Sequence, residues 1–156
     1  MNFLVSDSQS YRHERIKAFL VQDSTVIAVL LASVDLEWTI RRTLAQLLVN
    51  MPELDPPNKL AGLRAYESLW NRVAQKKRLQ KLKDVVNDWD QIKRDYQLRH
   101  DMVHGRQGSG SVNYVGTIVD RILSASSRIA MYGKNNGANP YNRVRRRGPL
   151  VGLTKQ

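Results

Sequence analysis

The chain has 156 residues, no cysteine, and 25 Lys and Arg against 14 Asp and Glu, which gives a formal net charge of +11. This length suits one domain with its own core, and the lack of cysteine excludes disulfides, thiol nucleophiles, zinc ribbons and iron–sulfur clusters. The excess of positive charge predicts an anionic partner, with nucleic acid or an acidic protein favoured over a small substrate.

Neither a membrane span nor a targeting segment is expected. The longest apolar run, residues 26–34, is shorter than the roughly 20 apolar residues that cross a bilayer. The N-terminus has no basic region ahead of an apolar stretch and no small-residue cleavage site. These features, with the absence of cysteine, predict a cytoplasmic protein that stays out of the membrane.

Apolar residues recur at three- and four-residue intervals and nowhere alternate for long, so the sequence predicts an all-α domain. A first short helix is expected over residues 11–21. Asp23 and Ser24 can cap a long helix over residues 25–49, whose Val- and Ile-rich start should be buried on nearly all sides. Pro52 then ends it.

Two further helices follow. Asn58 can cap a third segment over residues 59–78. A fourth helix, residues 79–103, shows the most regular spacing, because apolar residues recur along its whole length and Gly105 is a natural residue to end it. Arg99 falls on this apolar stripe.

A last helix is expected over residues 112–132, ended by Gly133, after a loop over residues 106–111. Residues 134–156 are rich in Gly, Asn and Pro and lack apolar periodicity, which is typical of a flexible tail. The sequence therefore predicts a compact bundle of four to five helices in residues 1–133 and a flexible basic tail in residues 134–156.

The positive charge is concentrated in the second half. Residues 1–63 hold six basic and seven acidic residues, whereas residues 64–156 hold nineteen and seven. One basic block, residues 64–83, fits either a solvated helix face or a binding surface, and another, residues 121–156, fits either a phosphate-binding or a solubilising tail.

Only three histidines are available for chemistry. His13 lies in an Arg-His-Glu-Arg stretch and is expected on the surface. His100 and His104 are four residues apart and would share a helix face, but no third ligand lies nearby, so we expect no metal site and no cofactor. The chain also lacks a phosphate-binding loop and a serine nucleophile elbow.

Arg99 calls for an explanation, because a guanidinium in an apolar stripe is costly unless an anion pairs with it. One interpretation is a salt bridge to a core acid such as Asp35 or Glu37. The other is an anionic ligand, close to His104 at the end of the same helix.

The segment 99–104, Arg-His-Asp-Met-Val-His, follows Trp89, Ile92 and Tyr96 on one helix and precedes another amphipathic helix. Over residues 11–132 the chain thus resembles the HEPN family (higher eukaryotes and prokaryotes nucleotide-binding). HEPN domains are all-helical, of similar length, and carry an Arg-x4–6-His motif near the end of a late helix. The residue after the Arg is commonly Asn, Asp or His in that family, and here it is His100.

The resemblance implies a metal-independent endoribonuclease in which two protomers bring their motifs into one cleft. It implies that His104 acts as general base or acid, that Arg99 stabilises the phosphate and the transition state, and that His100 supports them. RNA supplies its own 2′-OH nucleophile, so the products would be a 2′,3′-cyclic phosphate and a 5′-OH. The candidate RNA contacts are Arg94, Arg106, Arg143, Arg145, Arg146 and Arg147.

One geometric condition applies to this motif. Positions five apart on an ideal helix point about 140° away from each other. Arg99 and His104 would therefore converge only where the helix ends or distorts, or if the His of one subunit met the Arg of the other.

Many HEPN proteins are toxins or defence effectors held in check by an inhibitory antitoxin or regulator, and the resemblance implies such a partner. Two alternatives remain open. One is a non-catalytic helical module that binds nucleic acid or protein through residues 64–83 and the tail. The other is an adaptor bundle in which Arg99 is simply ion-paired.

Overall fold

The structure, a computed structural model, describes residues 8–22, 24–54, 57, 60–105 and 112–143. These residues form six helices and no strand, so the predicted all-α bundle is confirmed. The helices are α1 (Gln9–Val21), α2 (Thr25–Leu47), α3 (Leu63–Lys77), α4 (Leu82–Val85), α5 (Trp89–Val103) and α6 (Val112–Asn135).

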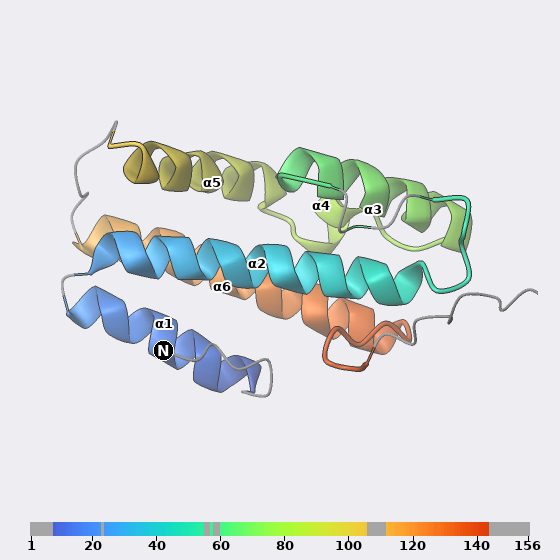
Figure 1. Ribbon diagram of the computed structural model, residues 1–156, viewed down its shortest axis with the longest axis horizontal. Coiled ribbons are helices and arrows are strands. Elements are labelled where there is room, and N and C mark those ends of the chain that lie inside the picture. The colour runs from blue at the N-terminus through green and yellow to red at the C-terminus, as the bar shows by residue number, and fades with distance from the viewer. Residues whose placement is uncertain (1–7, 23, 55–56, 58–59, 106–111, 144–156) are drawn as a thin grey trace, which may run out of the picture.

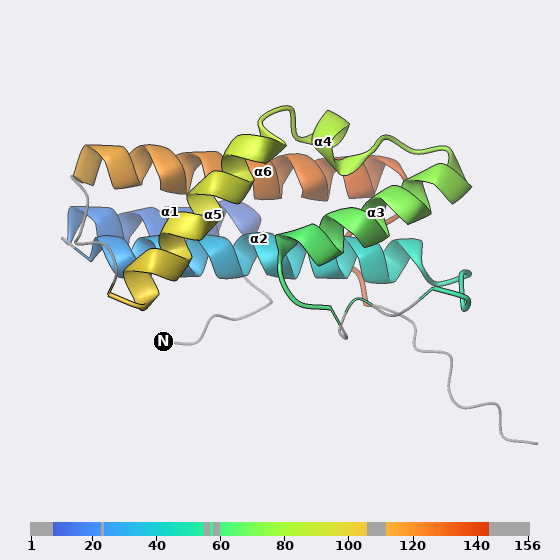
Figure 2. The ribbon, with the colours of Figure 1, turned by 90° about the horizontal axis from the view of Figure 1, so that it is seen from above.

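Helices α2 and α6 lie side by side and run in the same direction through the middle of the bundle (Figure 1). Helix α1 packs on one side of this pair, and α3, α4 and α5 lie on the other. Seen from above, α5 crosses the N-terminal half of α2 while α3 covers its C-terminal half (Figure 2). The end of α5 that carries Arg99 and the end of α3 therefore lie at opposite ends of the bundle.

The start of α1 is capped by a side chain. The Tyr11 N–H donates to Ser8 Oγ at 3.3 Å, which starts α1 two residues before the predicted Tyr11. Helix α2 begins at Thr25, as predicted, but the Ser24 side chain makes no capping hydrogen bond, and Asp23 lies outside the described residues. Helix α3 begins at Leu63, after Gly62 with φ +84°, whereas the predicted start at Lys59 and its cap Asn58 lie outside the described residues.

The prediction of one continuous helix over residues 79–103 is wrong. Val86 has extended backbone angles (φ −121°, ψ 93°), which separate the single turn of α4 from α5. Leu82, Val86 and Trp89 are nevertheless all buried. Apolar spacing was preserved across the break, so periodicity alone could not reveal it, and the turn-forming pair Asn87-Asp88 was the signal for it.

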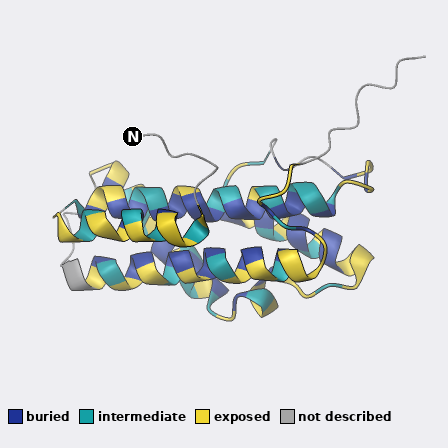
Figure 3. Cartoon of the chain, turned by 90° about the horizontal axis from the view of Figure 1, so that it is seen from below, coloured by how far each residue is buried: buried dark blue, intermediate teal, exposed yellow. Residues whose placement is uncertain are grey.

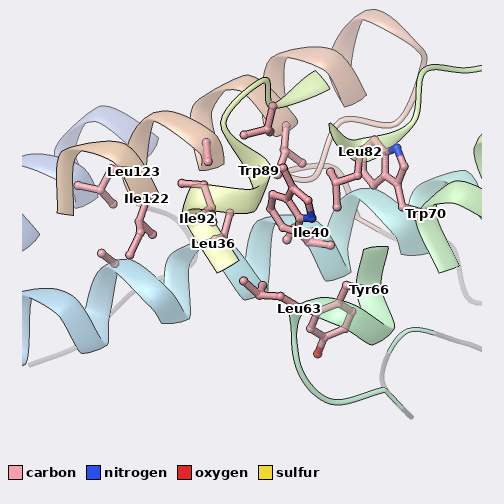
Figure 4. Close-up of a cluster of buried hydrophobic side chains, with 14 of the residues drawn as sticks. Leu36, Ile40, Leu63, Tyr66, Trp70, Leu82, Trp89, Ile92, Ile122 and Leu123 are labelled. Atoms are coloured by element: carbon pink, nitrogen blue, oxygen red, sulfur yellow. The ribbon is translucent and has the colours of Figure 1, made fainter. Parts of the chain in front are cut away.

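The core fills the space between the three layers. Figure 3 shows buried residues on the helix faces that meet one another and exposed residues on the outer faces. Trp89 of α5 is buried beside Ile40 of α2, and Trp70 of α3 is buried beside Leu82 of α4 (Figure 4). Each fully buried side chain of this kind stabilises the fold by about 1.5–3 kcal/mol, so the core fixes α5 and the end that carries Arg99.

The beginning of the predicted tail is folded. Helix α6 continues past Gly133 to Asn135, where the prediction ended it at about Tyr132. Ala138 and Pro140 are buried, and the Tyr141 and Trp38 rings lie 5.6 Å apart. Residues 136–143 thus pack back onto the bundle, and residues 144–156 lie outside the described residues.

Gly133 marks the closest approach between α6 and its neighbours. A methyl group there would lie 2.6 Å from the Ala138 carbonyl oxygen and 2.7 Å from Thr43 Cγ2 of α2. At Gly116 of the same helix, a methyl group would meet only Leu20 Cδ1, at 3.8 Å. The two glycines lie on the same helix and differ in the space around them, so substitutions at these positions can be compared directly.

We expect Gly133→Ala to lower the free energy of unfolding by about 1–3 kcal/mol, because the added methyl overpacks a site bounded by backbone. Gly116→Ala should instead raise it by up to about 1 kcal/mol, since alanine favours the helix and has room. Urea unfolding of both variants checks this. Equal effects at the two positions would contradict the close contact at Gly133.

Candidate functional site

The C-terminal end of α5 carries the predicted motif. Val103 is the last helical residue, and the His104 N–H still donates to the His100 carbonyl oxygen at 3.1 Å. Gly105 follows with φ +64° and donates to the Met102 carbonyl oxygen at 3.2 Å. The predicted helix end at Gly105 is therefore confirmed, and His104 stands at the exposed end of the helix.

His100 and His104 lie next to each other. Their ring centroids are 4.3 Å apart with an interplanar angle of 56°, and both residues are exposed. Two accessible imidazoles at this separation can share or exchange a proton with one ligand, and each ring can both donate and accept.

The Arg99 side chain is half-buried against Tyr96. Its guanidinium carbon lies 5.2 Å from the Tyr96 ring centroid, and Nη1 donates to the Tyr96 hydroxyl at 3.4 Å. Its buried Nε has no hydrogen-bond partner, and within the described residues the side chain forms no ion pair. Arg99 is thus held in place by an aromatic ring and keeps unused donors.

The interpretation in which Arg99 forms a salt bridge to Asp35 or Glu37 is wrong. Asp35 binds Arg12 and His13 instead, and Glu37 lies 3.6 Å from Arg41. The adaptor interpretation, in which Arg99 is merely ion-paired, therefore loses its two candidate partners.

Arg99 and His104 do not meet within one chain. No hydrogen bond or ion pair joins them in the described part of the chain, and the regular helix between them keeps the two side chains on different faces. The structure brings His100 and His104 together and leaves Arg99 apart on Tyr96.

The predicted RNA contacts are only partly visible. Arg94 is exposed on α5 and donates to Gln91 Oε1 from Nε at 3.0 Å. Arg143 is exposed at the end of the last described segment. The remaining four lie outside the described residues: Arg106, Arg145, Arg146 and Arg147.

A buried polar cluster that the sequence analysis missed lies around Asp35 of α2. Its carboxylate accepts hydrogen bonds from Arg12 Nε at 3.1 Å and Ser126 Oγ at 2.7 Å, and lies 3.0 Å from His13 Nε2. Arg12 also donates to the Tyr141 hydroxyl at 3.3 Å. The expectation of an exposed His13 was wrong, because its side chain is only 14% exposed.

The cluster stabilises the charged form of Asp35. Burial alone would raise the pKa of this carboxyl, but the hydrogen bonds from His13 and Ser126 and the positive charges of His13 and Arg12 outweigh it, so the pKa lies below its ordinary value. Burial likewise disfavours the charged Arg12, yet the Tyr141 hydrogen bond and the Asp35 charge raise its pKa. Burial raises the pKa of Tyr141, against the effect of Arg12.

This arrangement is suited to structure rather than to catalysis. The Asp35 side chain is 1% exposed and its two oxygens are already bound to α1 and α6, so no substrate reaches it. The cluster joins α1, α2, α6 and the segment that contains Tyr141. A sequence signal existed, because Asp35 is the single acid in the otherwise apolar start of α2.

No three potential metal-ligating His, Asp or Glu side chains gather in the portion of the chain that is described. Among those same residues, no helix has both the length and the apolar character needed to cross a bilayer.

Comparison with known proteins gave no match to this chain among family models, curated proteins or solved structures.

Proposed function

We propose that the protein is a HEPN-type, metal-independent endoribonuclease that cleaves RNA by attack of the 2′-OH. The observation that carries the proposal is Arg99. Its guanidinium is half-buried, held by Tyr96 and without an ion pair in the described residues, and it belongs to the same helix end as two exposed, adjacent imidazoles, His100 and His104. A fixed guanidinium beside proton-transfer groups is suited to phosphoryl chemistry.

Each side chain has a role in the proposed reaction. One imidazole removes the proton of the 2′-OH, and a protonated one donates to the departing 5′-oxygen. We assign His104 to one of these steps, with His100 supporting it. Arg99 donates hydrogen bonds to the phosphate oxygens, where negative charge grows as the pentavalent intermediate forms.

The proposed active unit is a homodimer. In one chain Arg99 and His104 lie on different faces of α5, so a cleft shared by two copies would bring the Arg of one protomer to the His of the other. Apolar side chains available to cover such an interface are exposed on the first half of α2 and at the end of α5. They are Val26, Ile27, Val34 and Val103.

The proposal extends to biological context. A ribonuclease without cofactor requirements acts wherever it meets RNA, so we place it in the cytoplasm as a toxin or defence effector. An inhibitory antitoxin or regulatory protein would hold it in check, and the basic second half of the chain would guide RNA to the cleft.

The test is cleavage of single-stranded RNA by purified protein in EDTA, with the product ends mapped. We expect cleavage without added metal and products with 2′,3′-cyclic phosphate and 5′-OH ends. Replacing every 2′-OH by 2′-O-methyl should abolish cleavage, because the nucleophile is gone. Intact RNA at micromolar protein, or cleavage that disappears in EDTA, would refute the proposal.

A further inference from the structure

A polar cavity of about 600 Å³ opens between one face of α3 and the segment that follows it. Four of its residues are spaced along that face of α3, and two come from the segment between α3 and α4. All but one are polar, two are cationic and none is acidic. They are Ser68, Asn71, Arg72, Gln75, Leu79 and Lys81.

The wall formed by residues 79–81 is fixed in place by side chains of the core. Trp70 Nε1 donates to the Gln80 carbonyl oxygen at 3.1 Å, and the Gln80 N–H donates to the Tyr132 hydroxyl at 2.8 Å. Asn71 Oδ1 accepts from the Leu82 N–H at 3.1 Å. The cavity is therefore preformed, and a ligand would not need to order it.

The cavity presents hydrogen-bond donors and positive charge. Arg72 and Lys81 form no ion pair in the described part of the chain. Glu67, on the same helix as Arg72, pairs with Lys93 at 3.2 Å. The Asn71 carbonyl is used by the backbone, so its NH₂ group remains free to donate.

We propose that this cavity, beside the C-terminal half of α3, binds a phosphodiester unit of single-stranded RNA as a second contact. The C-terminal end of α3 lies at the opposite end of the bundle from the C-terminal end of α5, which carries the Arg99/His104 motif (Figure 2). The inference rests on RNA being the substrate, as proposed above. The volume lies in the range of about 300–1,000 Å³ typical of small-molecule sites, which fits a nucleotide. Arg72 and Lys81 would bind the phosphate, and Leu79 offers an apolar wall to a base.

The test measures binding of a labelled, fully 2′-O-methylated single-stranded oligonucleotide by fluorescence anisotropy at several salt concentrations. This probe has no 2′-OH, so binding is read without cleavage. The variant Arg72→Gln/Lys81→Gln is compared with Lys77→Gln/Lys83→Gln, which removes the same charge from the end of α3 and from α4, at positions that do not line the cavity. All four positions are exposed, so both variants should fold.

We expect the cavity variant to weaken binding by about tenfold or more, as loss of charge-assisted hydrogen bonds does. The slope of log affinity against log salt should fall by about 0.7 for each phosphate that the cavity neutralises. The control variant should weaken binding only slightly. Equal losses in the two variants would overturn the proposal, because diffuse charge would then explain them.

Two further readouts separate this inference from the proposed function. Poly-glutamate that binds as tightly as the oligonucleotide, and loses affinity equally in the cavity variant, would overturn the RNA site in favour of an acidic protein partner. Wild type that binds the oligonucleotide through the cavity but leaves unmodified RNA intact supports the cavity and rejects the ribonuclease. If the wild type cleaves RNA and the cavity variant binds the oligonucleotide as well as the wild type does, the ribonuclease is supported and the cavity site is rejected.

Discussion

RNA cleavage by His104→Ala should fall by about 10²–10⁴-fold, the usual loss when a general acid or base is removed. His104 is exposed at the end of α5, and among the described residues its side chain contacts only the His100 ring. The variant should therefore unfold at the same urea concentration as wild type. Initial rates in EDTA, beside urea unfolding curves, measure both quantities.

Arg99→Ala should lower cleavage by about 10²–10³-fold, in line with removal of a donor to developing negative charge. Arg99→Lys keeps the charge but loses the planar fork and its packing on Tyr96, so it should recover only part of the rate. Arg128→Ala is the matched control. Arg128 lies on α6, and its exposed guanidinium pairs with Asp88 at 3.3 Å. A comparable loss of rate in Arg128→Ala would show that net charge, and not the Arg99 position, matters.

Mixing the two inactive variants tests whether the cleft is shared. If the Arg of one protomer works with the His of the other, a heterodimer of Arg99→Ala and His104→Ala contains one intact Arg/His pair. An equal mixture should then regain part of the wild-type rate, whereas each variant alone stays inactive. A mixture as inactive as its components would reject catalysis by residues of different protomers.

The sequence predicted two helix boundaries correctly where the apolar spacing coincided with a local start or stop signal. Gly105 ended the motif helix as expected, and Ser24 preceded α2. Spacing failed at Val86, because Leu82, Val86 and Trp89 are buried on both sides of a turn of the right length. Periodicity reports which residues face the core and does not report whether the backbone between them is continuous.

The sequence identified the residues of the candidate site but not how their side chains are arranged. Arg99, His100 and His104 could be singled out from their spacing, but the partner of Arg99 could not. Asp35 is 64 positions away in sequence and is bound instead by Arg12 and His13 from the first helix, which only tertiary packing reveals. Gly133 was expected to end the last helix, but it lies inside α6 because Ala138 and Thr43 come too close for any side chain. That contact also depends on tertiary packing.

Asp35→Asn should lower the free energy of unfolding by about 3–5 kcal/mol, because it removes the carboxylate of a buried ion pair with Arg12. The Arg12 and Asp35 side chains are only 5% and 1% exposed. Glu37→Gln on the same helix is the control. Its pair with Arg41 spans 3.6 Å at the surface and should cost at most about 1 kcal/mol.

A double-mutant cycle of Arg12→Met and Asp35→Asn isolates the pair from the other contacts of each residue. We expect a coupling energy of about 1–3 kcal/mol, within the range for residues in one hydrogen-bonded network. Additive effects would mean that the two side chains stabilise the fold through separate contacts, with Tyr141 and Ser126 carrying most of the cost.

The stabilisation by Asp35 should also depend on pH with a definite sign. Its pKa is lowered in the folded protein by His13, Ser126 and Arg12, so the unfolded chain binds the proton more readily than the folded one. The contribution is complete above the unfolded pKa of about 3.9, and it is lost as the pH falls through the lowered folded pKa. Urea unfolding of wild type and Asp35→Asn from about pH 7 to about pH 3 should therefore show a constant difference that shrinks only at the acid end. A difference that stays the same throughout would show that the charge of Asp35 contributes nothing, and that the cost of the substitution is one of packing.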